Sequence, residues 1–477
     1  MNIQNPKREK IMTTVLLIFV FLVLVGDAVA FENIRVFGMV LSAYRIFIPC
    51  LSIYLLACRI YQNKLAEIFK EKMLICYLAM MLFWILWGIL LLAISSYSDM
   101  HEALKELLAL VLGMAGIYCF FELCQSENRW DTVIKFLRIT AVVLCIWSMV
   151  EILAGLYLPT SSRYWAELIE REDWVKFLLS RLGSDTVYLT TTFFFNVNDY
   201  SVFIALFMPL FYLDENCSRR ENIVRGIILL LITFILSVND SNIVIIAVFL
   251  SMVLYVIIKK GSKKYAGGML GGLVAWYIIG SRIICNFFIV IKSALPIVDQ
   301  EIVKKYENIL QLLGRDKLVL LGEVVNAQLA NAANESGSLY VRIMITISSL
   351  KMTLKTKLMG AGPGAFTNYI ERNEKDSKLV NPHNWWMEIM AQYGVIVFAL
   401  YFLCTAVLCI KIYLLYKKNG ERKLLLFLCV AVTFCIACVA PSNYLKFSYQ
   451  WLIPSVGIVL LKYSSEWHRS EEPLKSP

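Results

Sequence analysis

The sequence predicts an all-α integral membrane protein, with about twelve transmembrane helices and a large extracytoplasmic loop between the ninth and the tenth. Of the 477 residues, 59% are hydrophobic and 17% are charged, whereas a soluble domain is about half apolar and about one quarter charged. Apolar runs of roughly 20 residues, the length that crosses a bilayer, recur along the whole chain. Lys and Arg gather in the short segments between these runs, as they do in cytoplasmic loops.

The predicted spans follow the apolar runs in chain order. A basic flank precedes the first, as in a signal peptide, but no small-residue cleavage site stands out in a polar segment after it, so we expect this helix to be retained. The seventh and eighth are short and could be one broken hairpin. The spans are predicted near residues 11–30, 37–58, 73–95, 103–123, 140–157, 194–213, 226–238, 242–258, 267–290, 395–416, 424–440 and 447–463.

The loops predict the orientation of the chain. Five short loops that fall on one side are rich in Lys and Arg, so the positive-inside rule makes that side, and with it both termini, cytoplasmic. We expect residues 1–477 to form a single polytopic membrane domain, with extracytoplasmic loops at 159–192 and 292–392 and a cytoplasmic tail at 464–477. The basic loops are residues 59–72, 127–138, 219–225, 259–264 and 417–423.

Composition also excludes several classes of protein. The net charge of +10 does not indicate a nucleic-acid partner, because the cations are mostly confined to these loops. The thirteen cysteines lie mostly within spans, and the long outer segments 159–192 and 296–382 contain none, so no disulfide framework is expected. These outer loops contain no Asp-x-Asp and no His/Cys cluster, so we expect no metal and no cofactor.

Four charged residues lie within or at the rims of predicted spans, where charge is costly. For Asp27, Glu106 and Glu151 we favour an interfacial position or a buried structural pair. Arg45 lies toward the middle of its span and keeps its charge, so it requires an anionic partner. That partner is either a protein carboxylate or a lipid phosphate, and the sequence does not choose between them.

The segment 336–393 is the most informative part of the chain. Arg342 lies on an otherwise apolar helical stretch, where it is either an interface anchor or a functional cation. Gly360, Gly362 and Gly364 follow in the run GAGPGAF. Glycine permits positive φ, so successive N–H groups there could point at one anion. The spacing matches neither a P-loop nor a dinucleotide fingerprint, and a tight turn is the favoured alternative.

The run NPHNWWMEIM comes next. Asn381 is a good N-cap and Pro382 a good first helical residue, which predicts His383 in the first turn of a helix. The positive end of the helix favours a neutral imidazole, which can act as a general base. A purely structural role for His383 is equally open.

Three residues that follow His383 could support a site. Asn384 and Glu388 are four residues apart and share a helical face. Trp385 and its neighbour Trp386 suit an interfacial aromatic belt, which we favour, or a platform for a sugar.

The order of these motifs resembles the O-antigen ligase and polymerase family, which includes capsule and teichuronic acid polymerases. That family has an Arg on a helix of a late outer loop, a G-x-G-x-G-x-F turn, an H-N pair before the next span and a Gly soon after. An Asn followed by an apolar helix with a Pro comes earlier. The positions that match here are Arg342, residues 360–366, His383, Asn384, Gly394, Asn198 and Pro209.

The sequence departs from the family at one position. Family members often carry an Arg, implicated in lipid phosphate binding, at the outer start of a span in the middle of the chain. Asn242 stands there in this sequence. Arg45 and Lys292 are the candidates to replace that cation.

The resemblance implies a glycosyltransferase of GT-C-like architecture in the bacterial cytoplasmic membrane. It implies a polyprenyl-diphosphate-linked glycan as donor, a glycan or a lipid as acceptor, membrane lipids around it, and flippase and chain-length regulator proteins as partners. Arg342, with Arg45 and the backbone of Gly360, Gly362 and Gly364, would hold the diphosphate. His383 would take the proton of the acceptor hydroxyl.

Four residues would support the acceptor in this mechanism, namely Asn384, Glu388, Asn198 and Trp385. A polymerase and a ligase would differ only in the acceptor, and we lean to the polymerase. Two other classes remain open. A transporter or flippase of the same glycans would place its site at the bilayer midplane, and a non-catalytic envelope scaffold would not need the ordered motifs.

Overall fold

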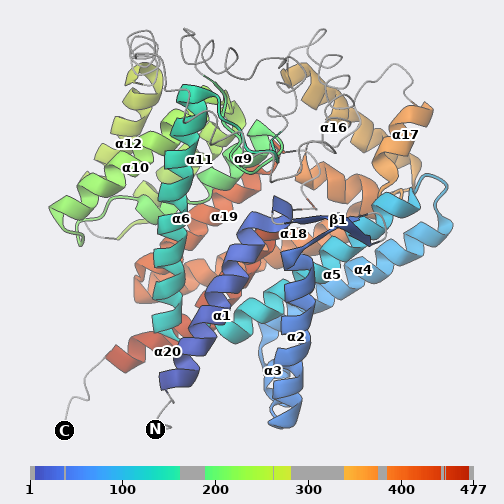
Figure 1. Ribbon diagram of the computed structural model, residues 1–477, viewed down its shortest axis with the longest axis horizontal. Helices are drawn as coiled ribbons and strands as arrows, with labels where there is room; N and C mark the ends of the chain where they lie inside the picture. Colours follow the sequence, from blue (N-terminus) through green and yellow to red (C-terminus); the bar gives the residue numbers. More distant parts are fainter. Residues whose placement is uncertain are drawn as a thin grey trace. The chain divides into compact units, whose positions relative to one another are not determined.

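The chain is described here from a computed structural model, which is almost entirely helical (Figure 1). The structure describes residues 6–28, 30–36, 39–161, 188–260, 263–280, 338–373, 384–441, 445 and 447–471. These residues divide into two compact units. Unit 1 comprises Met1–Leu137, Leu339–Ala431 and Ser442–Pro477, and unit 2 comprises Arg138–Ser338 and Val432–Pro441.

Seven of the described helices are long and apolar enough to cross a membrane. This confirms the all-α membrane class, while the predicted total of about twelve spans stays a prediction. Helix α11 (Asn242–Ile258) is apolar but shorter. The seven spans are Pro6–Ala28, Ala43–Tyr61 (α2), Lys72–Ile94 (α4), Met100–Leu123 (α5), Glu127–Ala154 (α6), Arg219–Val238 (α10) and Trp385–Asn419 (α18), the first formed by α1 (Pro6–Val25) and a short 3-10 turn.

The other described helices are not among these seven spans. They comprise α3 (Leu65–Lys70), α9 (Val197–Ala205), α12 (Lys264–Ala275), α16 (Ser338–Lys355), α17 (Ala365–Asn373), α19 (Arg422–Ala437) and α20 (Leu452–Glu471), with 3-10 turns at Met208–Phe211 and Ser448–Trp451. Helix α20 continues well past residue 464, so the predicted cytoplasmic tail begins inside a helix.

Two predicted spans differ in detail from the structure. The span predicted at 194–213 is not one helix, because the nine-residue α9 gives way to a 3-10 turn that contains Pro209, and proline cannot donate to a continuing helix. The span predicted from residue 37 begins at Ala43 instead. An antiparallel hairpin of β1 (Ala30–Val36) and β2 (Met39–Ser42) precedes it, paired from Ala30↔Ser42 to Val36↔Met39 with an irregularity between Phe31 and Arg35.

The core of unit 1 is formed where α4, α5, α18 and α20 pack together. Glycines bring these helices close, since a Cβ added at Gly113 would lie 2.6 Å from the Trp451 ring. Small residues at such contacts are typical of packed membrane helices. The first residue of α1 and the last of α20 lie at the same lower end of the unit in Figure 1. The Lys462 amine of α20 lies 2.7 Å from the Glu71 carboxylate, which directly precedes α4.

A buried carboxylate organises unit 2. Glu151, in α6, is fully buried, and one of its oxygens accepts hydrogen bonds from the Thr190 hydroxyl at 2.7 Å and from the N–H groups of Thr191 and Thr192 at 2.8 and 2.9 Å. The Trp147 indole donates to the other oxygen at 2.9 Å. Glu151 is therefore a structural anchor for the loop 190–192, one of the two roles expected for it.

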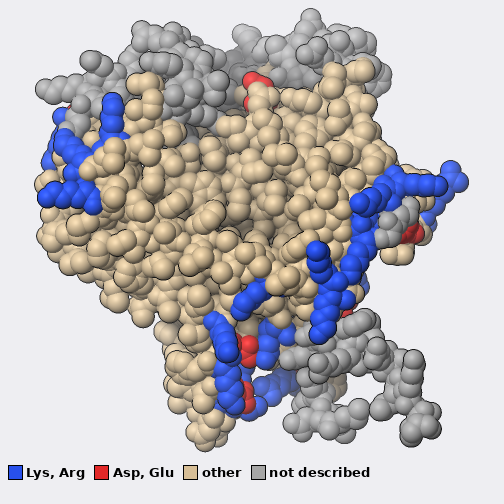
Figure 2. All heavy atoms as spheres, turned by 180° about the vertical axis from the view of Figure 1, so that it is seen from behind, with Lys and Arg blue, Asp and Glu red and all other residues tan. Residues whose placement is uncertain are grey.

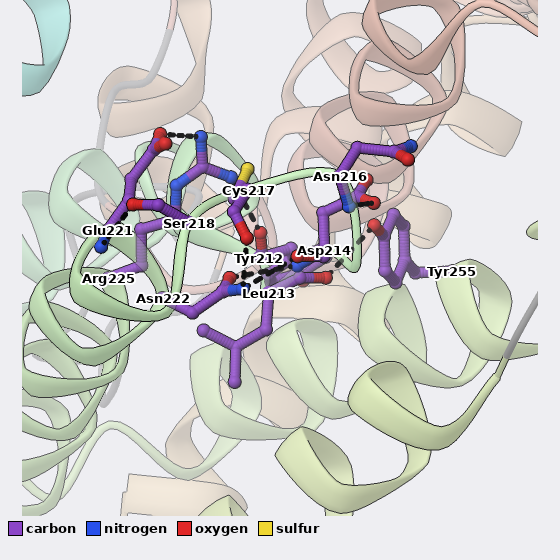
Figure 3. A network of polar contacts seen from close by, with 10 residues as sticks. All are labelled: Tyr212, Leu213, Asp214, Asn216, Cys217, Ser218, Glu221, Asn222, Arg225 and Tyr255. Carbon is purple, nitrogen blue, oxygen red and sulfur yellow. Dashed lines mark hydrogen bonds and ion pairs between the residues drawn. The ribbon is translucent and has the colours of Figure 1, made fainter.

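The corner before α10 is also tied by polar contacts (Figure 3). Asn222 donates to the Asp214 carbonyl at 2.7 Å and accepts from the Asp214 N–H at 3.1 Å. Arg225 donates to the Tyr212 carbonyl at 3.1 Å and pairs with Glu221 at 2.5 Å. The predicted basic loop 219–225 therefore lies in the first turns of a helix.

Candidate functional site

The glycine run 360–364 docks onto a kink in α18. Gly394 has φ 84° and ψ 173° and interrupts that helix. The Ala361 and Gly362 N–H groups donate to the carbonyls of Ala391 and Gln392 at 3.0 and 2.9 Å, and Val395 N–H donates to the Leu358 carbonyl at 3.0 Å. The run therefore pairs with the kink much as one strand pairs with another.

Glycine is required on both sides of this contact. Gly360 has φ +93°, and a Cβ there would lie 2.5 Å from Gln392 O and from Gly394 N. At Gly394 a Cβ would lie 2.4 Å from Met359 O. A side chain at either position would meet both an unfavourable φ and a clash with backbone. Of the two interpretations of GAGPGAF, the structure gives the tight turn.

The buried carboxylate of Glu106 accepts hydrogen bonds from the glycine turn and from α18. Glu106 in α5 is 4% exposed, and one of its oxygens accepts from Gly364 N–H at 3.1 Å and from the Tyr393 hydroxyl at 2.9 Å. Its other oxygen accepts from Gln392 at 3.3 Å, and Gln392 accepts from Ala365 N–H at 3.2 Å. The interfacial position that was one alternative for Glu106 is therefore wrong, and its role as a buried structural acceptor is confirmed.

These bonds count against the assignment of Gly362 and Gly364 to the diphosphate, an assignment that stays a prediction for Gly360. The N–H groups of Gly362 and Gly364 donate to Gln392 and Glu106, so in this structure neither is directed at a bound anion. A carboxylate already occupies the place that an anion would take. Sequence reasoning missed this pairing because 258 residues separate Glu106 from Gly364. The one available signal was a carboxylate inside an apolar helix, which must find donors.

The connection between α4 and α5 also forms hydrogen bonds with the glycine turn. The hydroxyls of Ser95 and Ser98 donate to the Ala361 carbonyl, the second at 3.5 Å, and the Trp87 indole donates to the Tyr393 carbonyl at 2.9 Å. The turn, the kink of α18 and the start of α5 thus form one interlocked junction within unit 1.

Helix α18 begins later than predicted. Its first residue is Trp385, and the Asn384 side chain caps it by accepting from the Trp386 and Met387 N–H groups at 3.1 and 3.3 Å. Asn384, and not the predicted Asn381, is therefore the N-cap of α18. Asn381, Pro382 and His383 lie outside the described residues.

Two predicted supporting residues are buried in the first turn of α18. Trp385 is 0% exposed and packs against the rings of Trp84, Tyr401 and Trp451 at centroid distances of 6.1, 5.8 and 6.3 Å. It is therefore neither an interfacial belt residue nor a sugar platform, since no face of the ring is open. Glu388 is 2% exposed on the same turn.

The two predicted arginines lie on different helices of the structure. Arg342 lies on α16, as expected, but its side chain is outside the described part. Arg45 forms an ion pair with Asp27 at 2.6 Å. Of the two partners considered for Arg45, the structure gives the protein carboxylate.

Asn198 and Asn242 both lie in unit 2, in helix first turns. The cap of α9 is Asn196, which accepts from Asn198 N–H at 2.8 Å. Asn242 donates to Asp240 at 2.9 Å and accepts from the Tyr277 hydroxyl at 3.2 Å. It holds a polar turn where the family often has a cation. Lys292, a candidate to replace that cation, lies outside the described residues.

A cluster that sequence reasoning did not assemble lies beside the glycine turn. The Tyr97 and Tyr369 rings contact edge to face at 5.3 Å. Lys355 lies over the Tyr369 ring at 5.6 Å and Arg372 over the Tyr97 ring at 5.9 Å, and both cations are exposed. We call these four residues the Tyr97 cluster.

Among the described residues, no group of three or more His, Cys, Asp or Glu could hold a metal ion.

Comparisons with known proteins cover most of the chain. Residues 226–402 match a family model described as O-antigen ligase. The chain is also 20% identical, over 402 residues, to the teichuronic acid biosynthesis protein TuaE of Bacillus subtilis (strain 168), an alignment that covers 82% of this chain and 72% of that protein. The resemblance to the O-antigen ligase and polymerase family is thereby confirmed, and the matching segment 226–402 contains Arg342, the glycine turn and His383.

Proposed function

We propose that this protein is a membrane glycosyltransferase that polymerises oligosaccharide repeat units carried on polyprenyl diphosphate. The reaction takes place at the outer face of the bacterial cytoplasmic membrane. One observation carries the proposal. The matched segment holds Arg342, the glycine turn and His383–Asn384 in the family's order. Within that segment, the glycine turn packs against the kink of α18.

The junction fixes the start of α18, which begins two residues after His383 in the sequence. Asn384, the next residue, caps α18, and Trp385 anchors the first turn in an aromatic core. Ten residues after Asn384, Gly394 is locked against the glycine turn. Catalytic groups act efficiently when the elements that carry them cannot shift. The fixed start of α18 therefore supports a catalytic role for His383, which stands two residues before that helix in the sequence.

The proposed reaction is a displacement at the anomeric carbon of the donor sugar. His383 accepts the proton of the acceptor hydroxyl as its oxygen forms the new glycosidic bond. The bond between the anomeric carbon and the phosphate oxygen breaks, and polyprenyl diphosphate leaves with the electron pair. Arg342 binds this diphosphate through its guanidinium fork and stabilises the charge that develops on it.

The Tyr97 cluster supports a glycan substrate on the same unit. Its exposed cations, Lys355 and Arg372, lie over tyrosine rings, and such pairs can contact both the apolar face of a sugar and an anionic group. The Arg372 guanidinium also donates to the Ser96 carbonyl at 2.8 Å, which fixes its position. We place the glycan chain near this cluster.

A transfer assay tests the proposal. Purified protein is incubated with a polyprenyl-diphosphate-linked repeat unit, and the products are resolved by size. We expect a ladder from the wild type and from His101→Ala, which removes an exposed histidine, and no product from His383→Ala. Near-normal turnover by His383→Ala would rule out the proposed base.

The same assay separates the alternatives. A product that forms only with a separate lipid, wall or protein acceptor, by a single jump in size, would identify a ligase. No product from the wild type with any acceptor would favour a transporter of the same lipid-linked glycans, whose activity is measured instead as movement between leaflets.

A further inference from the structure

A second candidate site lies in unit 1, away from the glycine turn. A cavity of about 780 Å³ opens where α1 and α2 meet the junction between α5 and α6. This volume is within the range of small-molecule sites. Its charged lining comprises Lys7, Arg8, Arg59, Lys64 and Arg129, together with Glu9 and Glu122. One of the groups of Lys and Arg in Figure 2 lies at its lower end, near the start of α1 and the end of α2.

Two of these cations are held in place by the two carboxylates. The Arg129 Nε donates to Glu9 at 2.8 Å, and the Arg59 Nε donates to the buried Glu122 at 2.9 Å. Arg59 also pairs with Glu67 at 3.0 Å, and the Arg129 Nη1 donates to the Leu123 carbonyl at 2.8 Å. Both guanidiniums are therefore engaged within the protein and fix the shape of this part of the cavity.

The lining has more positive than negative charge. Arg8 and Lys64 are both exposed and form no ion pair with any residue that the structure describes. Since the two carboxylates already have arginine partners, the cavity carries an excess of cationic donors. Such an excess attracts a ligand with a phosphate group, whose oxygens accept from arginine in pairs.

The wall beside these cations is apolar. Ile11 and Met12 from α1 and Tyr54 and Leu55 from α2 also line the cavity, and Ile11 and Tyr54 are 54% and 63% exposed. Both helices are candidate membrane spans, so the apolar wall continues into the bilayer. A charged pocket that leads onto lipid-facing apolar surface matches the two parts of a phospholipid.

We propose that this cavity binds the phosphate headgroup of an anionic phospholipid, with the acyl chains lying along the apolar wall of α1 and α2. By the predicted orientation this is a lipid of the cytoplasmic leaflet. The proposal does not depend on the proposed transferase activity, because its evidence comes from a different part of unit 1. A lipid held there would tie α1 and α2 to the α5–α6 junction.

The test compares two double variants with equal loss of charge. Arg8→Gln with Lys64→Gln removes two cations of the cavity. Lys10→Gln with Lys70→Gln removes two exposed cations from the same region that do not line it. Each protein, in neutral detergent, is titrated with dioleoyl phosphatidylglycerol, and the rise of its unfolding midpoint gives an apparent affinity. Dioleoyl phosphatidylcholine and glycerol 3-phosphate are titrated in parallel.

We expect phosphatidylglycerol to stabilise the wild type and the Lys10/Lys70 variant alike. The Arg8/Lys64 variant should need about thirtyfold more lipid, since each cation near an anionic lipid contributes about fivefold. Equal losses in both variants, or equal stabilisation by phosphatidylcholine, would overturn the proposal. Stabilisation by glycerol 3-phosphate that depends on Arg8 and Lys64, at concentrations no higher than those of the lipid, would assign the cavity to a soluble phosphate compound and overturn the lipid assignment.

Discussion

The backbones of Gly360 and Gly394 lie directly against each other, although 34 residues of sequence and the end of a long loop separate them. A Cβ on Gly360 would lie 2.5 Å from the Gly394 nitrogen. Both residues have positive φ, +93° and +84°. The segment that joins α16 to α17 is thereby fixed to α18, and the contact leaves no room for a side chain at either glycine.

Gly394→Ala should destabilise the protein and lower transfer. The backbone of Gly394, with φ 84° and ψ 173°, lies in a region that only glycine adopts readily, which costs an L-residue about 1–3 kcal/mol, and the overlap with the Met359 carbonyl adds to this. The free energy of unfolding is measured in detergent, with Gly116→Ala as control, because a Cβ at Gly116 meets nothing within 4 Å. Equal stability of the two variants would show that the junction is not rigid.

Replacing Glu106 should loosen the glycine turn. Glu106→Gln puts an amide N–H₂ in place of one carboxylate oxygen, so a donor must face the Gly364 N–H, the Tyr393 hydroxyl or the Gln392 amide. Leaving a buried donor unsatisfied costs about 1–3 kcal/mol. We expect thermal unfolding at a lower temperature and a matching loss of transfer.

Two further variants check this account. Glu102→Gln removes a partly exposed carboxylate of the same helix and should change the unfolding temperature little. Tyr393→Phe removes one of the three donors to Glu106 and should cost about 1 kcal/mol. If Glu106→Gln matched Glu102→Gln, the carboxylate would not be needed to close the turn.

Glu421, in the connection between α18 and α19, should make stability depend on pH. Burial disfavours its charge, but hydrogen bonds from Ser464 and Asn419 and the charge of Lys423 outweigh burial and hold the pKa of this carboxyl below its usual value. A lowered folded-state pKa stabilises the protein above the unfolded-state value, and the contribution is lost as pH falls through the folded-state pKa.

The unfolding midpoints of wild type and Glu421→Gln should therefore differ at neutral pH and converge in acid, below the usual carboxyl pKa of about 4.5. The difference at neutral pH should stay within about 1 kcal/mol, because the group is partly exposed and solvent screens it. A difference that grows as pH falls would show that the hydrogen bonds do not favour the ionised carboxyl.

Local sequence signals predicted the class of this fold and the motifs of its site, but not their contacts. Long apolar runs identify spans such as α4 and α5 because a bilayer accepts little else. The predicted role of Trp385, in an interfacial belt or as a sugar platform, was wrong. A Trp near a membrane interface and a Trp in a helix core have the same local sequence. The partner of Glu106 was not predictable, because it comes from a loop far along the chain. The cap of α18 was misplaced by three residues, since both Asn381 and Asn384 are good caps.

Arg342→Lys should abolish most transfer while the protein stays folded. Lysine keeps the charge but offers a point donor in place of the two parallel donors that grip a diphosphate. Loss of one such preorganised donor lowers kcat by about 100- to 1,000-fold in comparable sites. The assay measures kcat and KM together with the unfolding midpoint, and Arg220→Lys, an exposed cation on α10, is the control. Full activity in Arg342→Lys with an unchanged midpoint would mean that Arg342 contributes only charge, and its proposed role in stabilising the leaving diphosphate would be wrong.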